Sequence, residues 1–379
     1  MSEGSTLAGT RGGLARVRDV LAVADDAELA ERLAARTLAL VGVPSESRDE
    51  AALAAHVLGA LHAGGVAARD AGDTCVVAEC GATDGPLVVL AGHLDTVPAQ
   101  GNRPGRRDAE AVHGLGASDM KAALAVMVEM ALLLRDARMR VALCFFGREE
   151  LGIADSALTP LLTRDVLLAG ADLALVMEPT DNAVQGGCLG NINATWTFTG
   201  RSGHSARPWL ADNAITHAAA GVTALHAVPP GRVDVDGLEF TEVASVTRIA
   251  GGIAENVIPD TVACHVNYRY PPGSSAAEAE ARIRALCDRP QSVLEIHSNA
   301  PSGAVAVSES LVQELIAAGS LAVAPKQAWT PVAEFALAGI PAVNFGPGDP
   351  AYAHRRDERV RVDALVKSAR TLEAFLCSS

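Results

Sequence analysis

Apolar positions follow two different patterns along the first half of the chain. Short continuous apolar runs, "PLVVLAG" (86–92), "RVALCFFG" (140–147) and "ADLALVMEP" (171–179), predict buried strands. The longer stretches "DDAELAERLAARTLALVGV" (25–43) and "DMKAALAVMVEMALLLRDA" (119–137) have apolar residues at helical spacing. Because strands alternate with helices, we predict an α/β fold: a mixed sheet with helices on both faces. A further helix is expected over "ELGIADSALTPLL" (150–162).

The pattern changes near residue 188. "NINATWTFTGR" (191–201) alternates apolar and polar residues, as a half-exposed strand does. A helix over about 211–227, strands over 239–249 and 261–271, and a helix over 274–288 follow. This β-α-β-β-α-β order is typical of a small domain whose sheet has one open face.

The α/β pattern returns near residue 297, with a strand in "GIPAVNFG" (339–346) and a helix from about 361. We therefore predict one discontinuous catalytic domain, 1–186 and 297–379, interrupted by an inserted α+β domain, 187–296. The Gly-, Ala- and Arg-rich first 24 residues are expected to be loosely ordered.

Composition and charge limit the partners that the protein can have and the compartment in which we expect it. The formal net charge of −14 argues against nucleic acid and anionic membranes as partners. The seven cysteines are scattered without a CxxC pair, which favours reduced thiols. The N-terminus lacks the apolar core of a signal peptide, and the longest apolar helical run is too short to span a bilayer and contains Glu129. We expect a cytoplasmic protein.

Five side chains with metal-binding chemistry follow predicted strands or precede a helix. They are His93 in "AGHLDTVP", Asp119 in "GASDMKAALA", Glu150 in "GREELG", Glu178 in "VMEPT" and His354 in "GPGDPAYAH". Each alone has an ordinary structural explanation: a turn, a helix cap, a charge that complements a helix dipole or a solvated loop. Strand ends in open α/β sheets, however, are where sites are built. Together these residues predict one site at the carboxyl edge of the sheet.

Two imidazoles and three carboxylates suit two divalent metal ions, and Asp119 could bridge them. Glu150 can then be a ligand while its neighbour Glu149 stays free to take a proton from water. A metal pair lowers the pKa of water and polarises a carbonyl, which is the chemistry of amide hydrolysis. Asp95, two residues after His93, is expected to hydrogen-bond its ring and fix the tautomer.

The five motifs, in this order, resemble the co-catalytic zinc aminoacylase/carboxypeptidase superfamily across nearly the whole chain. The segments "GRSGHSARPWLADNAI" (200–215) and "GGIAENVIPDTVACHVNYRYPP" (251–272) look like those of the bacterial succinyl-diaminopimelate desuccinylases, particularly the actinobacterial ones. The resemblance implies a zinc-exopeptidase-like fold with a lid and dimerisation domain, two divalent ions (Zn²⁺ or Co²⁺) and a homodimer. It also implies cleavage of an N-acyl amino acid amide, best N-succinyl-LL-diaminopimelate, which gives succinate and LL-diaminopimelate.

The resemblance assigns roles to individual residues. His93 and Glu178 would hold one ion, Glu150 and His354 the other, and Asp119 both, with a cis peptide bond between Asp119 and Met120. Glu149 would act as general base and then as general acid. The remaining roles fall to residues outside the metal centre: His204 would stabilise the oxyanion in the active site of a partner subunit, Asn256 and Arg269 would bind substrate, and Gly346 in "FGPGDP" would line the pocket with its backbone groups.

Two departures affect the substrate. Pro331 stands in "QAWTPVAEF" where the nearest relatives are expected to have an acidic residue, and "QGGCLGN" (185–191) lacks an Arg that some desuccinylases place there. The alternatives are an acetylornithine deacetylase-like or dipeptidase-like enzyme of the same superfamily and, in another class, a catalytically inactive binding module.

Overall fold

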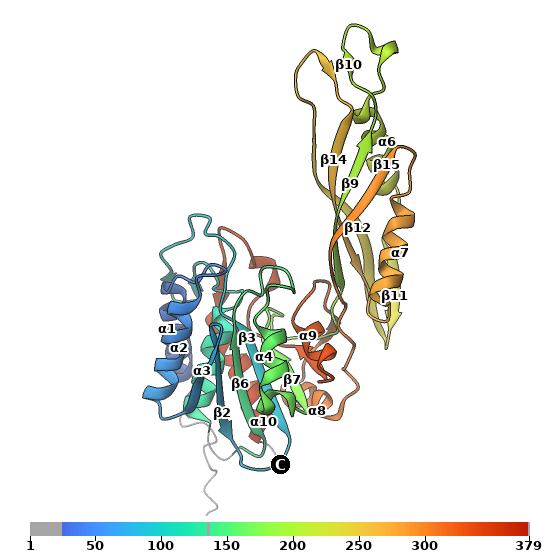
Figure 1. The fold of residues 1–379 in the computed structure, drawn as a ribbon. Coiled ribbons are helices and arrows are strands. Elements are labelled where there is room, and N and C mark those ends of the chain that lie inside the picture. The colour runs from blue at the N-terminus through green and yellow to red at the C-terminus, as the bar shows by residue number, and fades with distance from the viewer. Residues whose placement is uncertain (1–24, 135–136, 378–379) are drawn as a thin grey trace, which may run out of the picture.

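The computed structural model describes residues 25–134 and 137–377, so the prediction for the first 24 residues lies outside the described residues. A large mixed sheet forms the catalytic domain (Figure 1). Its strands, in spatial order, are β1 (Ala67–Gly72), β2 (Cys75–Gly81), β6 (Arg140–Phe146), β3 (Leu87–His93), β7 (Leu173–Val176), β17 (Ala342–Asn344), β8 (Val184–Gly186) and β16 (Val323–Pro325).

Helices cover both faces of this sheet, as predicted. One face packs against α1 (Asp26–Gly42), α2 (Ala51–Ala63), α3 (Lys121–Leu133), α8 (Ser310–Gly319) and α10 (Val362–Cys377). The other packs against α4 (Leu158–Arg164), α5 (Val166–Ala169) and α9 (Val332–Leu337). A small sheet of β18 (Arg359–Arg361), β5 (Ala111–His113) and β4 (Arg106–Arg107) lies beside them.

The strand directions decide where a site can form. Strand β3 runs parallel to both β6 and β7, and β7 runs parallel to β17. The carboxyl ends of these four strands therefore meet at one edge of the sheet, and the loops that leave them can converge there.

The prediction of a helix over 150–162 is wrong for the first half of that range. Residues 149–157 form turns and irregular backbone, and α4 begins only at Leu158. Glu149 and Glu150 therefore do not lie at a helix N-terminus, which removes the helix dipole as an explanation for the pair. The side chain of Asp119 likewise caps no helix, because the residue before α3 is Met120 and no side chain caps that helix.

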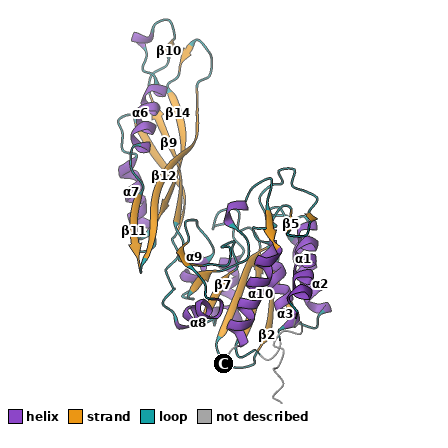
Figure 2. Cartoon of the chain, turned by 180° about the vertical axis from the view of Figure 1, so that it is seen from behind, coloured by secondary structure: helices purple, strands orange, loops and turns teal. Residues whose placement is uncertain are grey.

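The inserted domain stands away from the catalytic domain as an elongated body (Figures 1 and 2). Its five-stranded antiparallel sheet has the order β11 (Gly231–Val235), β12 (Leu238–Gly251), β14 (Thr261–Tyr270), β9 (Gly190–Thr199), β15 (Ser292–Ala300). Helices α6 (Ala214–His226) and α7 (Ala276–Leu286) pack on one face, and the other face is open, as the alternating burial of β9 and β14 shows. The sheet continues past residue 296, where we expected the domain to end, because β15 keeps pairing with β9 up to Ala300.

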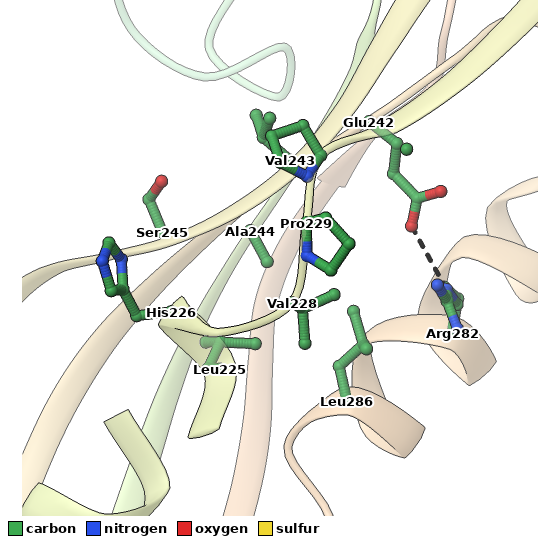
Figure 3. A pocket seen from close by; sticks show the side chains of 12 residues that line it. Leu225, His226, Val228, Pro229, Glu242, Val243, Ala244, Ser245, Arg282 and Leu286 are labelled. Atoms are coloured by element: carbon green, nitrogen blue, oxygen red, sulfur yellow. Dashed lines mark hydrogen bonds and ion pairs between the residues drawn. The ribbon is translucent and has the colours of Figure 1, made fainter. Parts of the chain in front are cut away.

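The far tip of this domain consists of β10 (Gly203–His204) paired with β13 (Val257–Ile258) and the short helix η1 (Pro208–Leu210). Nearer the middle, a pocket of about 230 Å³ opens between the ends of α6 and α7 and strand β12 (Figure 3). Apolar side chains line most of it, and the Arg282–Glu242 ion pair closes one side. It contains none of the predicted site residues.

Across residues 25–134 and 137–377, no helix is long and apolar enough to cross a lipid bilayer.

Candidate metal centre

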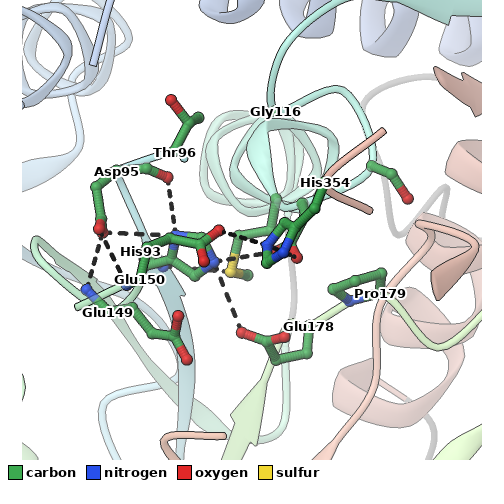
Figure 4. Close-up of polar contacts among 12 residues, drawn as sticks. His93, Asp95, Thr96, Gly116, Glu149, Glu150, Glu178, Pro179 and His354 are labelled. Atoms are coloured by element: carbon green, nitrogen blue, oxygen red, sulfur yellow. Dashed lines mark hydrogen bonds and ion pairs between the residues drawn. The ribbon is translucent and has the colours of Figure 1, made fainter. Parts of the chain in front are cut away.

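The predicted ligands converge at the carboxyl edge of the large sheet (Figure 4). His93 is the last residue of β3, and Glu150 and Glu178 lie in the loops that follow β6 and β7. Asp119 lies two residues before the first residue of α3 and has the expected cis peptide bond to Met120. His354 follows β17 and has a left-handed backbone conformation (φ 59°). Residues with a β-carbon rarely adopt this conformation, so the surrounding loop must impose it.

Asp119 lies between the two histidines. Its Oδ1 is 3.1 Å from Nε2 of His93, and its Oδ2 is 3.5 Å from Nε2 of His354. On the outer sides, Glu178 Oε1 is 3.7 Å from the His93 ring nitrogen and Glu150 Oε1 is 3.0 Å from that of His354. The ligand atoms thus form two groups, each within 4.8 Å: His93, Asp119 and Glu178, and Asp119, Glu150 and His354. The two groups share Asp119, as a bridging carboxylate requires.

The electrostatics of this cluster fit bound cations. Burial, together with the nearby Asp119 carboxylate, raises the pKa of Glu178 to about 7. Hydrogen bonds to Asp119 and Glu150 raise the pKa of His354 to about 11. Burial opposes protonation of His93, but the hydrogen bond to Asp119 and the surrounding carboxylates raise its pKa well above its usual range. The carboxylates therefore hold positive charge on both rings, and divalent ions can supply that charge instead.

An orphaned atom points to the same conclusion. Oε1 of Glu178 is buried and has no hydrogen-bond partner among the described residues, although it faces His93. A buried carboxylate oxygen without a partner is costly, and a metal ion would satisfy it. On the other side of the carboxylate, Nζ of the buried Lys326 lies 3.9 Å from Oε2 and donates to the carbonyl oxygen of Pro179 at 3.3 Å.

Asp95 acts differently from the expectation. The ring nitrogen Nδ1 of His93 lies 3.0 Å from the backbone oxygen of Asp95, whereas the carboxylate oxygen Oδ1 is 3.6 Å away. The carboxylate instead accepts the backbone N–H groups of Glu149 and Glu150, at 3.0 and 3.1 Å, and the hydroxyl of Ser47 at 2.8 Å. Asp95 therefore fixes the His93 ring through its main chain and the neighbouring glutamates through its side chain.

Glu149 belongs to neither of the two groups that share Asp119, but it forms a third group with His93 and Glu150. One of its carboxylate oxygens lies within 4.8 Å of ligand atoms of His93 and Glu150, yet the carboxylate forms no hydrogen bond or ion pair with another described residue. Burial raises its pKa well above its usual range, and the nearby Glu178 carboxylate adds to this shift. A buried carboxyl group whose pKa is raised in this way holds a proton more readily than an exposed one, which suits a group that accepts a proton and returns it.

Gly346 has a packing role that we did not predict. A β-carbon there would lie 2.3 Å from the Met177 oxygen and 2.5 Å from the Glu178 oxygen, so only glycine allows this close approach. Its N–H donates to the hydroxyl of Thr180, and its oxygen accepts from Thr180 and Asn182. These backbone groups are therefore engaged within the protein instead of facing a ligand, and Gly346 positions the backbone of Glu178.

Three predicted residues lie outside this cluster. His204 and Asn256 are exposed at the tip of the inserted domain, where the oxygen of Asn256 accepts the N–H of Ser205. Nδ1 of His204 accepts the N–H of Ala206 at 3.0 Å, so the proton of the neutral ring is on Nε2, which can donate. Arg269 lies near the opposite end of β14, and its Nε donates to Asn267 Oδ1 at 2.9 Å.

Sequence reasoning missed three side chains at the site: Ser47, Lys326 and Glu358. Glu358 is buried and accepts backbone N–H groups from residues 116–119, and burial raises its pKa to about 7. Each of the three acts through a contact with a segment far away in the sequence, and no local pattern marks such contacts.

The comparison with known families matches residues 89–378 to peptidase family M20/M25/M40. The chain belongs to this family. Within it, the chain is 39% identical over 344 residues to a Mycobacterium tuberculosis protein assigned as the succinyl-diaminopimelate desuccinylase DapE, which covers 90% of this chain and 96% of that protein. It is 34% identical over 296 residues to the succinyl-diaminopimelate desuccinylase of Corynebacterium glutamicum, covering 76% and 80% of the two chains.

Solved structures of the family share the fold. A tripeptidase from Staphylococcus aureus matches with a TM-score of 0.75 at 20% identity, over 92% of this chain and 98% of the tripeptidase chain. The predicted superfamily and the α/β fold with a mixed sheet are thereby confirmed.

Proposed function

We propose that this protein is a metal-dependent amidohydrolase that cleaves N-succinyl-LL-diaminopimelate to succinate and LL-diaminopimelate. The observation that carries the proposal is the pair of ligand groups joined by Asp119, with Glu149 beside them and bonded to neither. The substrate rests on the relatives named as desuccinylases, which are 34–39% identical over most of the chain.

The chain's own residues supply binding and proton transfer. Two divalent ions, Zn²⁺ in our proposal with Co²⁺ as the alternative, would polarise the substrate carbonyl and lower the pKa of water. His93, Asp119 and Glu178 would hold one ion, and Asp119, Glu150 and His354 the other. Glu149 accepts the proton of the attacking water and then donates it to the leaving amine.

Arg269 suits the carboxylates of such a substrate. Because Asn267 holds its Nε, the guanidinium is oriented while its terminal nitrogens can form two parallel bonds to a carboxylate. Asn267 is itself fixed, since its amide donates to Asn191 at 2.7 Å and to Asn193 at 2.9 Å.

The inserted domain, which we place at residues 187–300, is in our proposal a lid and a dimerisation module. His204 and Asn256 lie at its tip, away from the metal centre of their own chain. A homodimer that brings this tip to the partner's metal centre would supply an Nε2 donor to the developing oxyanion. The cytoplasmic location stays a prediction from the sequence.

The test is a substrate assay with the purified full-length protein loaded with Zn²⁺. We expect release of succinate from N-succinyl-LL-diaminopimelate with a kcat/KM well above that for N-acetylornithine and for dipeptides. A preference for either of the other substrates would contradict the desuccinylase proposal and point to the role of Pro331 and loop 185–191. Loss of all three activities with two ions bound would favour a binding module.

A further inference from the structure

Glu358 is a buried carboxylate in the segment that also carries His354. Its side chain is only 2% exposed. Oε1 accepts the backbone N–H groups of Ser118 and Asp119, both at 3.0 Å, and Oε2 accepts that of Gly116 at 2.9 Å. A single carboxylate thus binds three backbone donors of the loop that delivers Asp119. Burying this carboxylate is costly unless all of these bonds form.

Two further contacts hold the same two segments together. The backbone oxygen of Glu358 accepts the N–H of Gly114 at 3.1 Å. The hydroxyl of Ser118 donates to the backbone oxygen of Asp349 at 2.8 Å. Gly348 permits this approach, because a β-carbon there would lie 2.3 Å from the Ser118 oxygen. Segment 348–358 is therefore bound to segment 114–119 on both sides of His354.

This arrangement affects the two ligand groups unequally. His93 and Glu178 belong to, or directly follow, strands of the large sheet, whose pairing fixes them independently of Glu358. Asp119 and His354 instead lie on the two loops that Glu358 joins, and their facing atoms are 3.5 Å apart. We propose that Glu358 is a positioning residue that sets the separation of Asp119 from His354, and hence the affinity for the ion held by Asp119, Glu150 and His354.

The inference rests on the two-ion centre of the proposed function but on no particular substrate, so it is tested by metal binding. Zn²⁺ is titrated into the metal-free full-length protein in competition with a chromophoric chelator, which yields two association constants. We expect Glu358→Gln to lower one of them about 10–100-fold, the range found when a residue that orients a ligand is changed. The other constant should fall less, because it shares only Asp119 with the disturbed loop, whereas His93 and Glu178 are held at the ends of strands of the large sheet.

Reference variants assign the effect. His354→Ala should abolish the same binding step that Glu358→Gln weakens. Asp357→Asn is the matched control, since this exposed neighbour pairs with Arg355 in its own loop and should leave both constants unchanged. Ser118→Ala removes the hydroxyl contact with the backbone oxygen of Asp349 and should weaken the same binding step less than Glu358→Gln does. This variant keeps the inference testable if Glu358→Gln does not fold.

Equal weakening of both steps would make Glu358 a general structural residue, and two unchanged constants would remove its role altogether; either result overturns the inference. If the unchanged protein takes up no ions, the two-ion centre itself fails, and the proposed function fails with it.

Discussion

The carboxyl edge of the large sheet and the tip of the inserted domain differ in how complete they are. At the sheet edge, His93, Asp119 and Glu178 are buried or nearly so and contact one another within one chain. At the tip, His204 and Asn256 are exposed, and they form hydrogen bonds with the local backbone. The first region is organised to hold cations, whereas in our proposal the second acts on a substrate only when the metal centre of a partner subunit is brought to it. The proposal thus separates chemistry that one chain can build from chemistry that would need two.

The largest effect is expected at the sheet edge. Glu149→Gln should lower kcat about 10²–10⁴-fold, because the proton-transfer group is lost while the ligands stay in place. Metal analysis of the variant should still find two ions, and KM should change little. Glu150→Gln is the matched comparison on the neighbouring residue, since it should lose an ion together with the activity. Undiminished kcat in Glu149→Gln would remove Glu149 as the base.

At the tip, His204→Ala should lower kcat about 10²–10³-fold, as the loss of one oxyanion donor does. If the donor comes from the partner, an equal mixture of His204→Ala and Glu149→Gln protein should recover about a quarter of the unchanged activity, because half of the dimers contain one complete site. Continued inactivity of the mixture, with mixed dimers shown by native mass spectrometry, would contradict an exchange across the dimer.

Between the two regions, Arg269→Lys should raise KM about tenfold or more, since a hydrogen bond to a charged group contributes about 1.5–3 kcal/mol and Lys cannot form two parallel bonds. Steady-state kinetics measure this change. Arg282→Lys is the control, because Arg282 pairs with Glu242 beside the pocket of Figure 3 instead of the metal centre. An unchanged KM for Arg269→Lys would exclude a carboxylate contact.

Metal removal should abolish the activity, but its effect on stability is the smallest effect expected here and sharpens the comparison best. Each ion present at about 100 times its dissociation constant stabilises the protein by about 2.7 kcal/mol, so a chelator should lower the melting temperature of the catalytic domain. Hydrogen exchange should become faster in residues 114–120 and stay unchanged in β9 and β14 of the inserted domain. Equal acceleration in both places would mean that the two regions are not energetically separate.

The sequence predicted the strands well because continuous apolar runs such as 86–92 and 140–147 are buried between two helical layers except at their first residues. It also singled out the five residues that converge at the sheet edge, because each follows a strand or precedes a helix; their role as metal ligands stays a prediction. The helix over 150–162 failed because a distant side chain overrides local propensity: Asp95 binds the backbone N–H groups of Glu149 and Glu150 and holds them in a turn. The role of Glu358 could not be predicted from the sequence either, because the backbone groups that it binds lie about 240 positions earlier in the chain.

The two oxygens of Asp119 face different histidines, and this has a consequence for how the centre can change during evolution. In our proposal one side chain contributes a ligand to both ion sites, so its loss would empty both at once. A descendant that works with a single ion would therefore arise by altering either outer pair, His93 with Glu178 or Glu150 with His354, but not by altering position 119.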